Sequence, residues 1–261
     1  MTPKVQGSGK KLALWIGGGI VAVVLLVLGG TWVYINLIKD DAPAELSFEE
    51  KDAASTTSAP AAASDPTAAA AGTTVAVADT AGSPASGEGI DGTWTATSAS
   101  ELGYRVKEVL FGQSTEGVGR TNAISGSLAV AGSTVESGDF TVDMTTVASD
   151  SRNRDRQFQG RIMDTSTFPT STFTLTQPIE LGTIPAEGET VTTSATGDLT
   201  LRGTTNSVTF DVQARLNGGN IEVDGSIPIV FADWDIPNPS FGPASTEDNG
   251  VLEFLLVFSR S

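Results

Sequence analysis

A strict alternation of apolar and polar residues over residues 207–231 is the sequence feature that most constrains the fold. In "SVTFDVQARLNGGNIEVDGSIPIVF", apolar or small side chains occupy every second position up to Leu216 and again from Ile221. This period of two places one set of side chains on one face of a strand. The four residues between the two runs, Asn217-Gly218-Gly219-Asn220, have the composition of a tight turn. The stretch therefore predicts an antiparallel hairpin.

The same period recurs in shorter runs, including "GDFTVDM", "STFTLTQ" and "GDLTLRG". Many short strands separated by Gly-rich turns are typical of an all-β sandwich or a closed antiparallel barrel, and the period alone does not choose between them. The side chains that the alternation directs to the interior are Phe140, Val142, Met144, Phe173, Leu175, Leu199, Leu201, Phe210, Val212, Phe231, Phe254 and Leu256.

The final apolar run, "VLEFLLVF" at residues 251–258, is apolar on both faces. A strand of this kind needs cover on its outer face as well as on its inner one. We therefore expect either another part of the protein or a second copy of the chain, in a homodimer, to lie against it.

An Arg-rich segment, "RNRDRQFQGRIMDTSTFPTSTF", interrupts the strand pattern at residues 152–173. Ser149 or Asp150 offers an N-cap, and Phe158, Ile162 and Met163 fall near helical spacing. Pro169 forbids continuation of a helix. The segment predicts a short amphipathic helix that plugs one end of a barrel or lies across it.

The arginines of this insert have two interpretations. One is a solvated face that pairs with the nearby aspartates, Asp150, Asp155 and Asp164. The other is a cationic rim that meets an anionic lipid head group. The candidate rim residues are Arg152, Arg154, Arg156 and Trp234, although a Trp near a turn is often an ordinary core residue.

Residues 12–38 form a run of 27 residues without a charge, long enough for a transmembrane helix. Three lysines precede the run and mostly acidic residues follow it, so the positive-inside rule leaves residues 1–11 in the cytoplasm and the rest outside the cell membrane. A cleaved signal peptide is the alternative, but the run is longer than its apolar core requires.

Residues 39–90 are rich in Ala, Ser, Thr, Pro and Gly, and they precede the barrel domain at residues 91–261. Such a composition predicts a flexible linker, because few large apolar side chains are available to offset the entropy of ordering. A coil of about 50 residues holds a domain roughly 40 Å from its anchor. Only "ELSFEEK" favours the alternative, that part of this segment folds or binds.

The composition also excludes several function classes. Cys and His are absent, which removes disulfides, thiolate and His-dependent catalysis, and the usual zinc and haem ligands. The formal net charge is -16, which makes nucleic acid an unfavourable partner. Asp233 and Asp235 form a carboxylate pair, but their position before Pro237 favours a solvated loop over acid/base chemistry or a calcium site. We therefore expect no enzyme activity, no metal and no cofactor.

Several separated motifs between about residues 92 and 261 resemble the YceI-like family of lipocalin-like polyisoprenoid-binding proteins. They are "ASDSRNRDRQF...FPTSTF", "GDLTLRGTTNSVTFDV" and "IPIVFADWDIPNPSFG", in that order. The matching positions are Arg154-Asp155, Phe168-Pro169 with Phe173, the set Gly197, Leu199, Thr200 and Gly203, and the segment Phe231 to Gly242. The chain departs from many members in having Gln157 and Phe158 where they carry a His.

The resemblance implies an extended antiparallel barrel of about eight strands whose apolar interior holds a long isoprenoid or a similar amphiphilic lipid. Together with the predicted anchor, it suggests a single-pass, extracytoplasmic binding protein that does no chemistry on its ligand. The alternative is a structural or interaction domain displayed on a membrane stalk, with an interior filled by its own side chains.

Overall fold

The computed structural model describes residue 30 and residues 42–57, 89–110, 112–242 and 244–261. Its principal strands in these ranges are β1 (Gly92–Ala96), β2 (Glu101–Leu110), β3 (Gln113–Thr121), β4 (Ile124–Ala131), β5 (Thr134–Asp143), β7 (Thr170–Leu175), β9 (Thr190–Leu201), β10 (Thr204–Asn217), β11 (Asn220–Val230) and β13 (Asn249–Arg260). Three short strands complete the set, β6 (Ala148–Ser149), β8 (Ile179–Glu180) and β12 (Ala244–Thr246).

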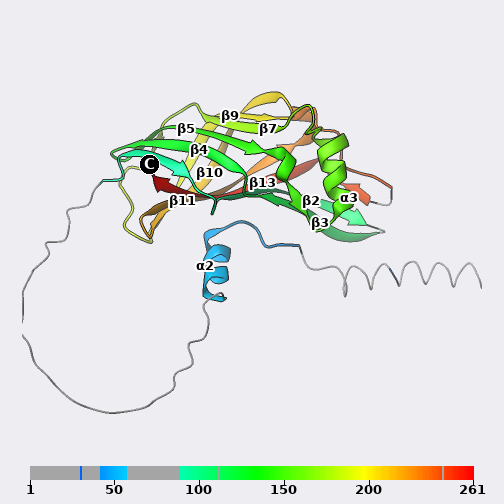
Figure 1. Cartoon of the computed structure of the whole chain (residues 1–261), viewed down its shortest axis with the longest axis horizontal. Coiled ribbons are helices and arrows are strands. Elements are labelled where there is room, and N and C mark those ends of the chain that lie inside the picture. The colour runs from blue at the N-terminus through cyan, green and yellow to red at the C-terminus, as the bar shows by residue number, and fades with distance from the viewer. Residues whose placement is uncertain (1–29, 31–41, 58–88, 111, 243) are drawn as a thin grey trace, which may run out of the picture.

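Eight of the strands within the described ranges close into a ring, in the order β1-β4-β5-β7-β9-β10-β11-β13, because β13 pairs back onto β1. Every neighbouring pair in this ring is antiparallel. The first half of β13 pairs with β2 instead of β1, and β2 pairs with β3. Strands β2 and β3 therefore continue the barrel wall at one end. The all-β prediction is confirmed, and the ring closure selects an eight-stranded barrel over a sandwich (Figure 1).

The predicted hairpin is formed by β10 and β11. Leu216 lies opposite Ile221 and Asn217 opposite Asn220, so the connection is the two-residue turn Gly218-Gly219. Both glycines have positive φ, 60° and 76°, as the hairpin turns that match strand twist require.

The interior is organised around a row of phenylalanine rings from β5, β7, β10 and β13. The ring centroids of Phe140 and Phe173 are 6.5 Å apart, those of Phe173 and Phe210 5.6 Å, and those of Phe210 and Phe254 5.9 Å. Glycines make room for the rings on the intervening strands: a Cβ at Gly197 would lie 2.4 Å from the Phe173 ring. Alternation on each strand thus produces one continuous apolar interior.

The Arg-rich insert lies at one end of the barrel, beside β2 and β3 (Figure 1). Helix α3 (Arg152–Gln157) continues into a π-helical turn, η3 (Phe158–Ile162), and its N-cap position is Ser151 rather than Ser149 or Asp150. Phe158 and Met163 are buried, and the Phe158 ring stacks on Tyr104 at 5.0 Å. The prediction of an amphipathic helix that covers a barrel end is confirmed.

Residues 42–57, which we call the strap, lie against the outside of the barrel and contain helix α2 (Phe48–Thr57). Phe48 is 4% exposed and packs on Leu255 and Val257, the outward side chains of β13. The prediction of a flexible linker is therefore wrong for this part of residues 39–90. The composition of a segment shows only its own apolar side chains. Here the strap is ordered because its one large buried side chain, Phe48, packs on apolar side chains of β13.

The predicted transmembrane run, residues 12–38, lies outside the described residues except for Gly30. Among the described residues, the helices are too short or too polar to cross a membrane.

Candidate functional site

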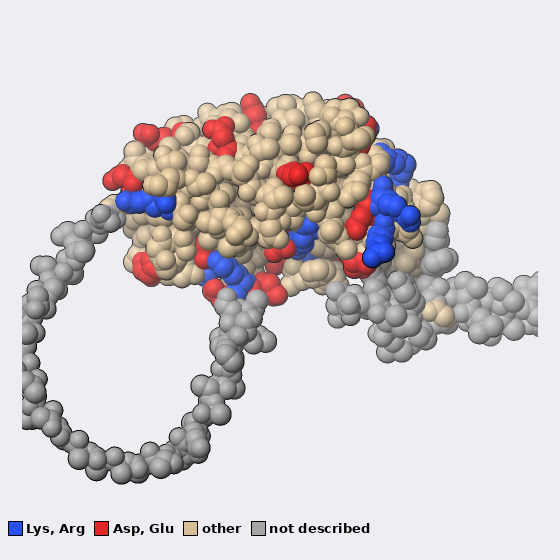
Figure 2. All heavy atoms as spheres, in the orientation of Figure 1, with Lys and Arg blue, Asp and Glu red and all other residues tan. Residues whose placement is uncertain are grey.

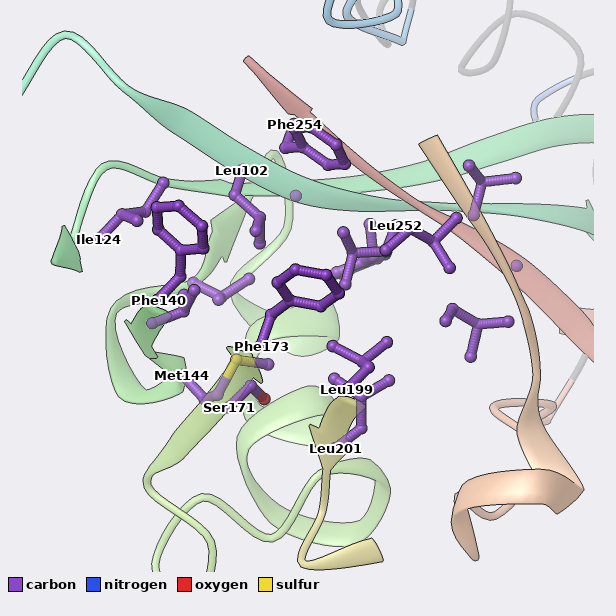
Figure 3. Close-up of a pocket in the computed structure, with 18 of the residues that line it drawn as sticks. Leu102, Ile124, Phe140, Met144, Ser171, Phe173, Leu199, Leu201, Leu252 and Phe254 are labelled. Carbon is purple, nitrogen blue, oxygen red and sulfur yellow. The ribbon is translucent and has the colours of Figure 1, made fainter. Parts of the chain in front are cut away.

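The barrel interior contains a cavity of about 520 Å³. All twelve residues that the alternation directs inward line it, and Figure 3 shows Phe140 of β5, Phe173 of β7, Leu199 and Leu201 of β9 and Phe254 of β13 around it. The strands of a closed barrel aim every second side chain at the axis, which explains why one simple pattern locates so much of the wall.

Several residues of the cavity wall are not among the twelve that the alternation predicts. Strand β2 contributes Leu102, Tyr104 and Val106, and α3 and η3 contribute Gln157 and Phe158. The signal for the β2 residues was present, since they alternate with polar or small residues in "ELGYRVKEVL". No short-range pattern indicates which wall residues meet the helix.

One polar atom stands out in the apolar wall. Ser171 is 5% exposed, and its Oγ is buried without a hydrogen-bond partner in the described structure. It lies beside Met144 on the cavity wall (Figure 3). An unpaired buried hydroxyl is costly, so this atom is a natural anchor for one polar group of a ligand.

The cavity opens at the end covered by α3, which we call the mouth. The polar lining residues Asn153, Arg154 and Thr246 are found here, together with Phe241, which is 64% exposed. Arg161 on η3 donates hydrogen bonds to the carbonyl oxygens of Asn238 and Pro239, both at 3.0 Å. The helical insert and the loop that carries Phe241 are thereby joined around the entrance.

The candidate rim residues have different positions. Only Arg154 lines the cavity, and its guanidinium already pairs with Glu108 at 2.9 Å and with Asp150. Arg152 and Arg156 are exposed on α3 and do not line the cavity. Trp234 is 4% exposed in the core, outside the cavity lining, so it does not form part of the rim.

The Arg154-Asp155 pair has a structural role in this arrangement. The Asp155 carboxylate accepts hydrogen bonds from the backbone N and the Oγ of Ser149, at 2.8 and 2.6 Å. Arg154 joins the same helix to β2 through Glu108. The pair therefore fixes α3 across the barrel end.

The carboxylate pair that the sequence offers lies on the surface, outside the cavity lining. Asp233 and Asp235 are exposed, and their backbone oxygens accept hydrogen bonds from Asn206 and Arg202. Over the described ranges, no three His, Cys, Asp or Glu side chains gather in a way that could hold a metal ion. What the site can do chemically is enclose an apolar chain.

The closed ring of strands, the apolar cavity within it and the helix at one end define a lipocalin-like barrel. The family comparison agrees with this class, since residues 94–258 match the YceI-like domain. The chain belongs to the YceI-like family. No match was found among curated proteins.

One solved structure shows the same fold, and others are similar in part. A polyisoprenoid binding domain from Saccharophagus degradans implicated in plant cell wall breakdown is 16% identical, with a TM-score of 0.51 over 65% of this chain and 98% of that one. BcnA from Burkholderia cenocepacia is 22% identical, with a TM-score of 0.48 over 62% and 98%. The Campylobacter jejuni YceI protein is 16% identical, with a TM-score of 0.40 over 55% and 84%.

Proposed function

We propose that this protein is a membrane-anchored, extracytoplasmic binding protein that holds a long isoprenoid or a similar amphiphilic lipid in its barrel and does not transform it. The observation that carries the proposal is the apolar cavity of about 520 Å³ enclosed by the barrel. The membrane anchor is the uncharged run at residues 12–38.

The cavity volume suits a lipid tail. An apolar cavity of roughly 150 Å³ binds a six-carbon ring, so about 520 Å³ has room for on the order of twenty carbon atoms. Burial contributes about 0.8 kcal/mol per methylene, which leaves a large surplus over the cost of immobilising the ligand. A longer chain would leave its head group at the mouth, near Phe241.

The polar groups fit an amphiphile that is only weakly charged or neutral near its head. Ser171 Oγ supplies one hydrogen bond inside the cavity, and Asn153 lies at the mouth. Since the guanidinium of Arg154 is already paired, an anionic head group gains less from it than from a free cation.

The Saccharophagus degradans domain is described as polyisoprenoid binding, which supports the same ligand class. A structural domain displayed on a stalk is the rival function. It predicts an interior filled by side chains, and a cavity of this size does not favour it.

Native mass spectrometry tests the proposal. The sample is residues 42–261 purified from the host, which retains the strap against β13. We expect a stoichiometric mass excess that solvent extraction identifies as one polyprenyl or related lipid. A bare protein that also takes up no added isoprenoid alcohol would favour the rival function. Alkaline carbonate extraction of the whole chain from host membranes tests the anchor separately.

A further inference from the structure

The strap is held to the barrel wall by a row of charged contacts. At one end, Arg215 forms a bidentate pair with Asp52, with both distances 2.8 Å, and a second pair with Glu222 at 2.8 Å. Lys51 also pairs with Glu222. The Arg215 guanidinium lies over the Phe48 ring, with its Cζ 4.3 Å from the ring centroid. These residues form a partly buried network in which each charge has a partner.

Backbone groups of the strap continue the row. The N–H of Phe48 donates to Asp224 Oδ2 and that of Leu46 to Glu253 Oε2, both at 3.2 Å. Asp224 and Glu253 are 5% and 3% exposed, although the strand alternation places both on the outside of the barrel. The barrel wall is therefore built to receive this segment.

The other end of the strap reaches the wall of β2 and β3. Arg105 donates to the carbonyl oxygen of Pro43 at 2.6 Å, and Arg120 to that of Ala44 at 3.0 Å. Arg105 is itself paired with Glu116 at 2.6 Å and Glu253 at 3.2 Å. Both arginines thus hold the first described residues of the strap.

These contacts give the strap a direction. Asp52 lies by Arg215, two residues from the hairpin turn at the end of the barrel away from α3. Pro43 lies by Arg105, from which β2 runs on to Leu110 at the mouth. Followed toward the N-terminus, the strap therefore leaves the barrel on its mouth half. Figure 1 shows α2 beneath the barrel, with the preceding residues running toward the α3 end.

The strap also limits the distance between barrel and anchor. Only residues 39–41 separate Ala42 from the end of the uncharged run at residue 38. A fully extended chain covers at most about 3.6 Å per residue, so four steps reach no more than roughly 14 Å. A docked strap thus replaces a tether of about 40 Å with a short one.

The surface at the mouth has the chemistry of a membrane contact. Phe241 and Val109 are 64% and 42% exposed, among the few large apolar side chains that the described structure leaves exposed. Arg152 and Arg156 are exposed on α3 at the same end of the barrel, and Figure 2 shows basic side chains at this end of a chain whose net charge is -16. Exposed aromatic and basic groups together suit the interface of an anionic bilayer.

We propose that the strap turns the mouth of the barrel toward the membrane from which the chain emerges and holds Phe241 and the α3 arginines against anionic lipid. This inference rests on the proposed anchor at residues 12–38. Its consequence is that a lipid passes between the bilayer and the cavity without crossing water.

The test uses the whole chain in vesicles of phosphatidylcholine and phosphatidylglycerol. The sequence has no Cys, so single substitutions accept a fluorescent label without background. Ser245→Cys places the label at the mouth, next to Val109, and Thr190→Cys places it at the opposite end, next to Arg215. Quenching by lipids with spin-labelled head groups reports which end lies at the bilayer.

We expect strong quenching at position 245 and little at position 190. Phe48→Ser, which removes the packing on β13, should abolish the difference, whereas Glu50→Gln on the exposed face of α2 should preserve it. Equal quenching at the two positions would overturn the orientation, and a difference that survives Phe48→Ser would overturn the role of the strap. A chain that alkaline carbonate strips from the vesicles would instead show that the proposed anchor is wrong, and the inference would fail with it.

Discussion

Substitution of Ala195 by Phe tests whether the barrel interior is a ligand cavity. Ala195 is 4% exposed, points inward from β9 and lines the cavity, so the new ring enters the space proposed for a lipid. The ring adds about six carbon atoms, and at about 0.8 kcal/mol for each displaced lipid carbon the loss reaches roughly 5 kcal/mol. A lipid displaced toward the mouth retains part of its burial. We therefore expect a loss of about 3 kcal/mol, on the order of a hundredfold in Kd.

The same substitution should weaken lipid binding without lowering the free energy of unfolding. A ring that fills open space buries apolar surface, so the midpoint of urea unfolding should stay the same or rise. In a fully packed interior the same substitution costs about 1–3 kcal/mol through overpacking. The assay is displacement of a fluorescent farnesyl analogue, paired with urea unfolding. Thr192→Phe, outward on the same strand, is the matched control. Destabilisation with unchanged affinity would refute the cavity argument.

Three further predictions concern the charged groups. Glu253→Ala should lower the free energy of unfolding by about 3 kcal/mol, because it removes the buried carboxylate that Arg105 and Arg120 share, and Glu253→Gln should cost less; urea unfolding at pH 7 measures both. Hydrogen bonding to Arg215 lowers the pKa of Asp52. Burial alone would raise the pKa of Glu222, but its hydrogen bonds to Lys51 and Arg215 outweigh burial, so this pKa is lowered as well. The two carboxylates therefore contribute fully to the stability of the docked strap at pH values above their ordinary pKa values, and this contribution is lost as pH falls through their lower folded pKa values. Burial raises the pKa of Asp224, so protonation of Asp224 at low pH partly offsets that loss. Hydrogen exchange of the strap, corrected for intrinsic rate, should therefore accelerate below about pH 4 and not between pH 5 and 8. Arg154→Gln should lower thermal stability and weaken binding of an isoprenoid phosphate and its alcohol about equally; selective loss of the phosphate would restore Arg154 as a head-group site.

The barrel wall was predictable because its rule is local. Each inward residue of β10 and β11 follows from a period of two, and the turn at Gly218-Gly219 fixes the register of the pair. Ring closure was not predictable in the same way, because the pairing of β1 with β13 joins residues more than 160 positions apart, such as Trp94 and Arg260. The resemblance to the YceI-like family supplied that step.

The candidate site was predicted less evenly. The twelve wall residues were found, but of the candidate rim only Arg154 lines the cavity. The sequence offers Asp150 as a partner of Arg154, whereas Glu108, which also pairs with it, lies 46 positions away on β2. Likewise, "WDIP" at a turn is compatible with an entrance or with a core plug, and the burial of Trp234 decides for the core.

The strap shows most clearly where composition fails as a guide. Its own residues bury little, and residues 39–90 therefore resemble a linker throughout. The complementary half of the signal lay some 200 residues away, in Leu255 and Val257 on the outer face of β13. The expectation that something must cover that face was sound, and the structure supplies a cover from within the chain. Two segments whose separate sequences indicate a linker and an overly apolar strand thus explain each other once they are packed together.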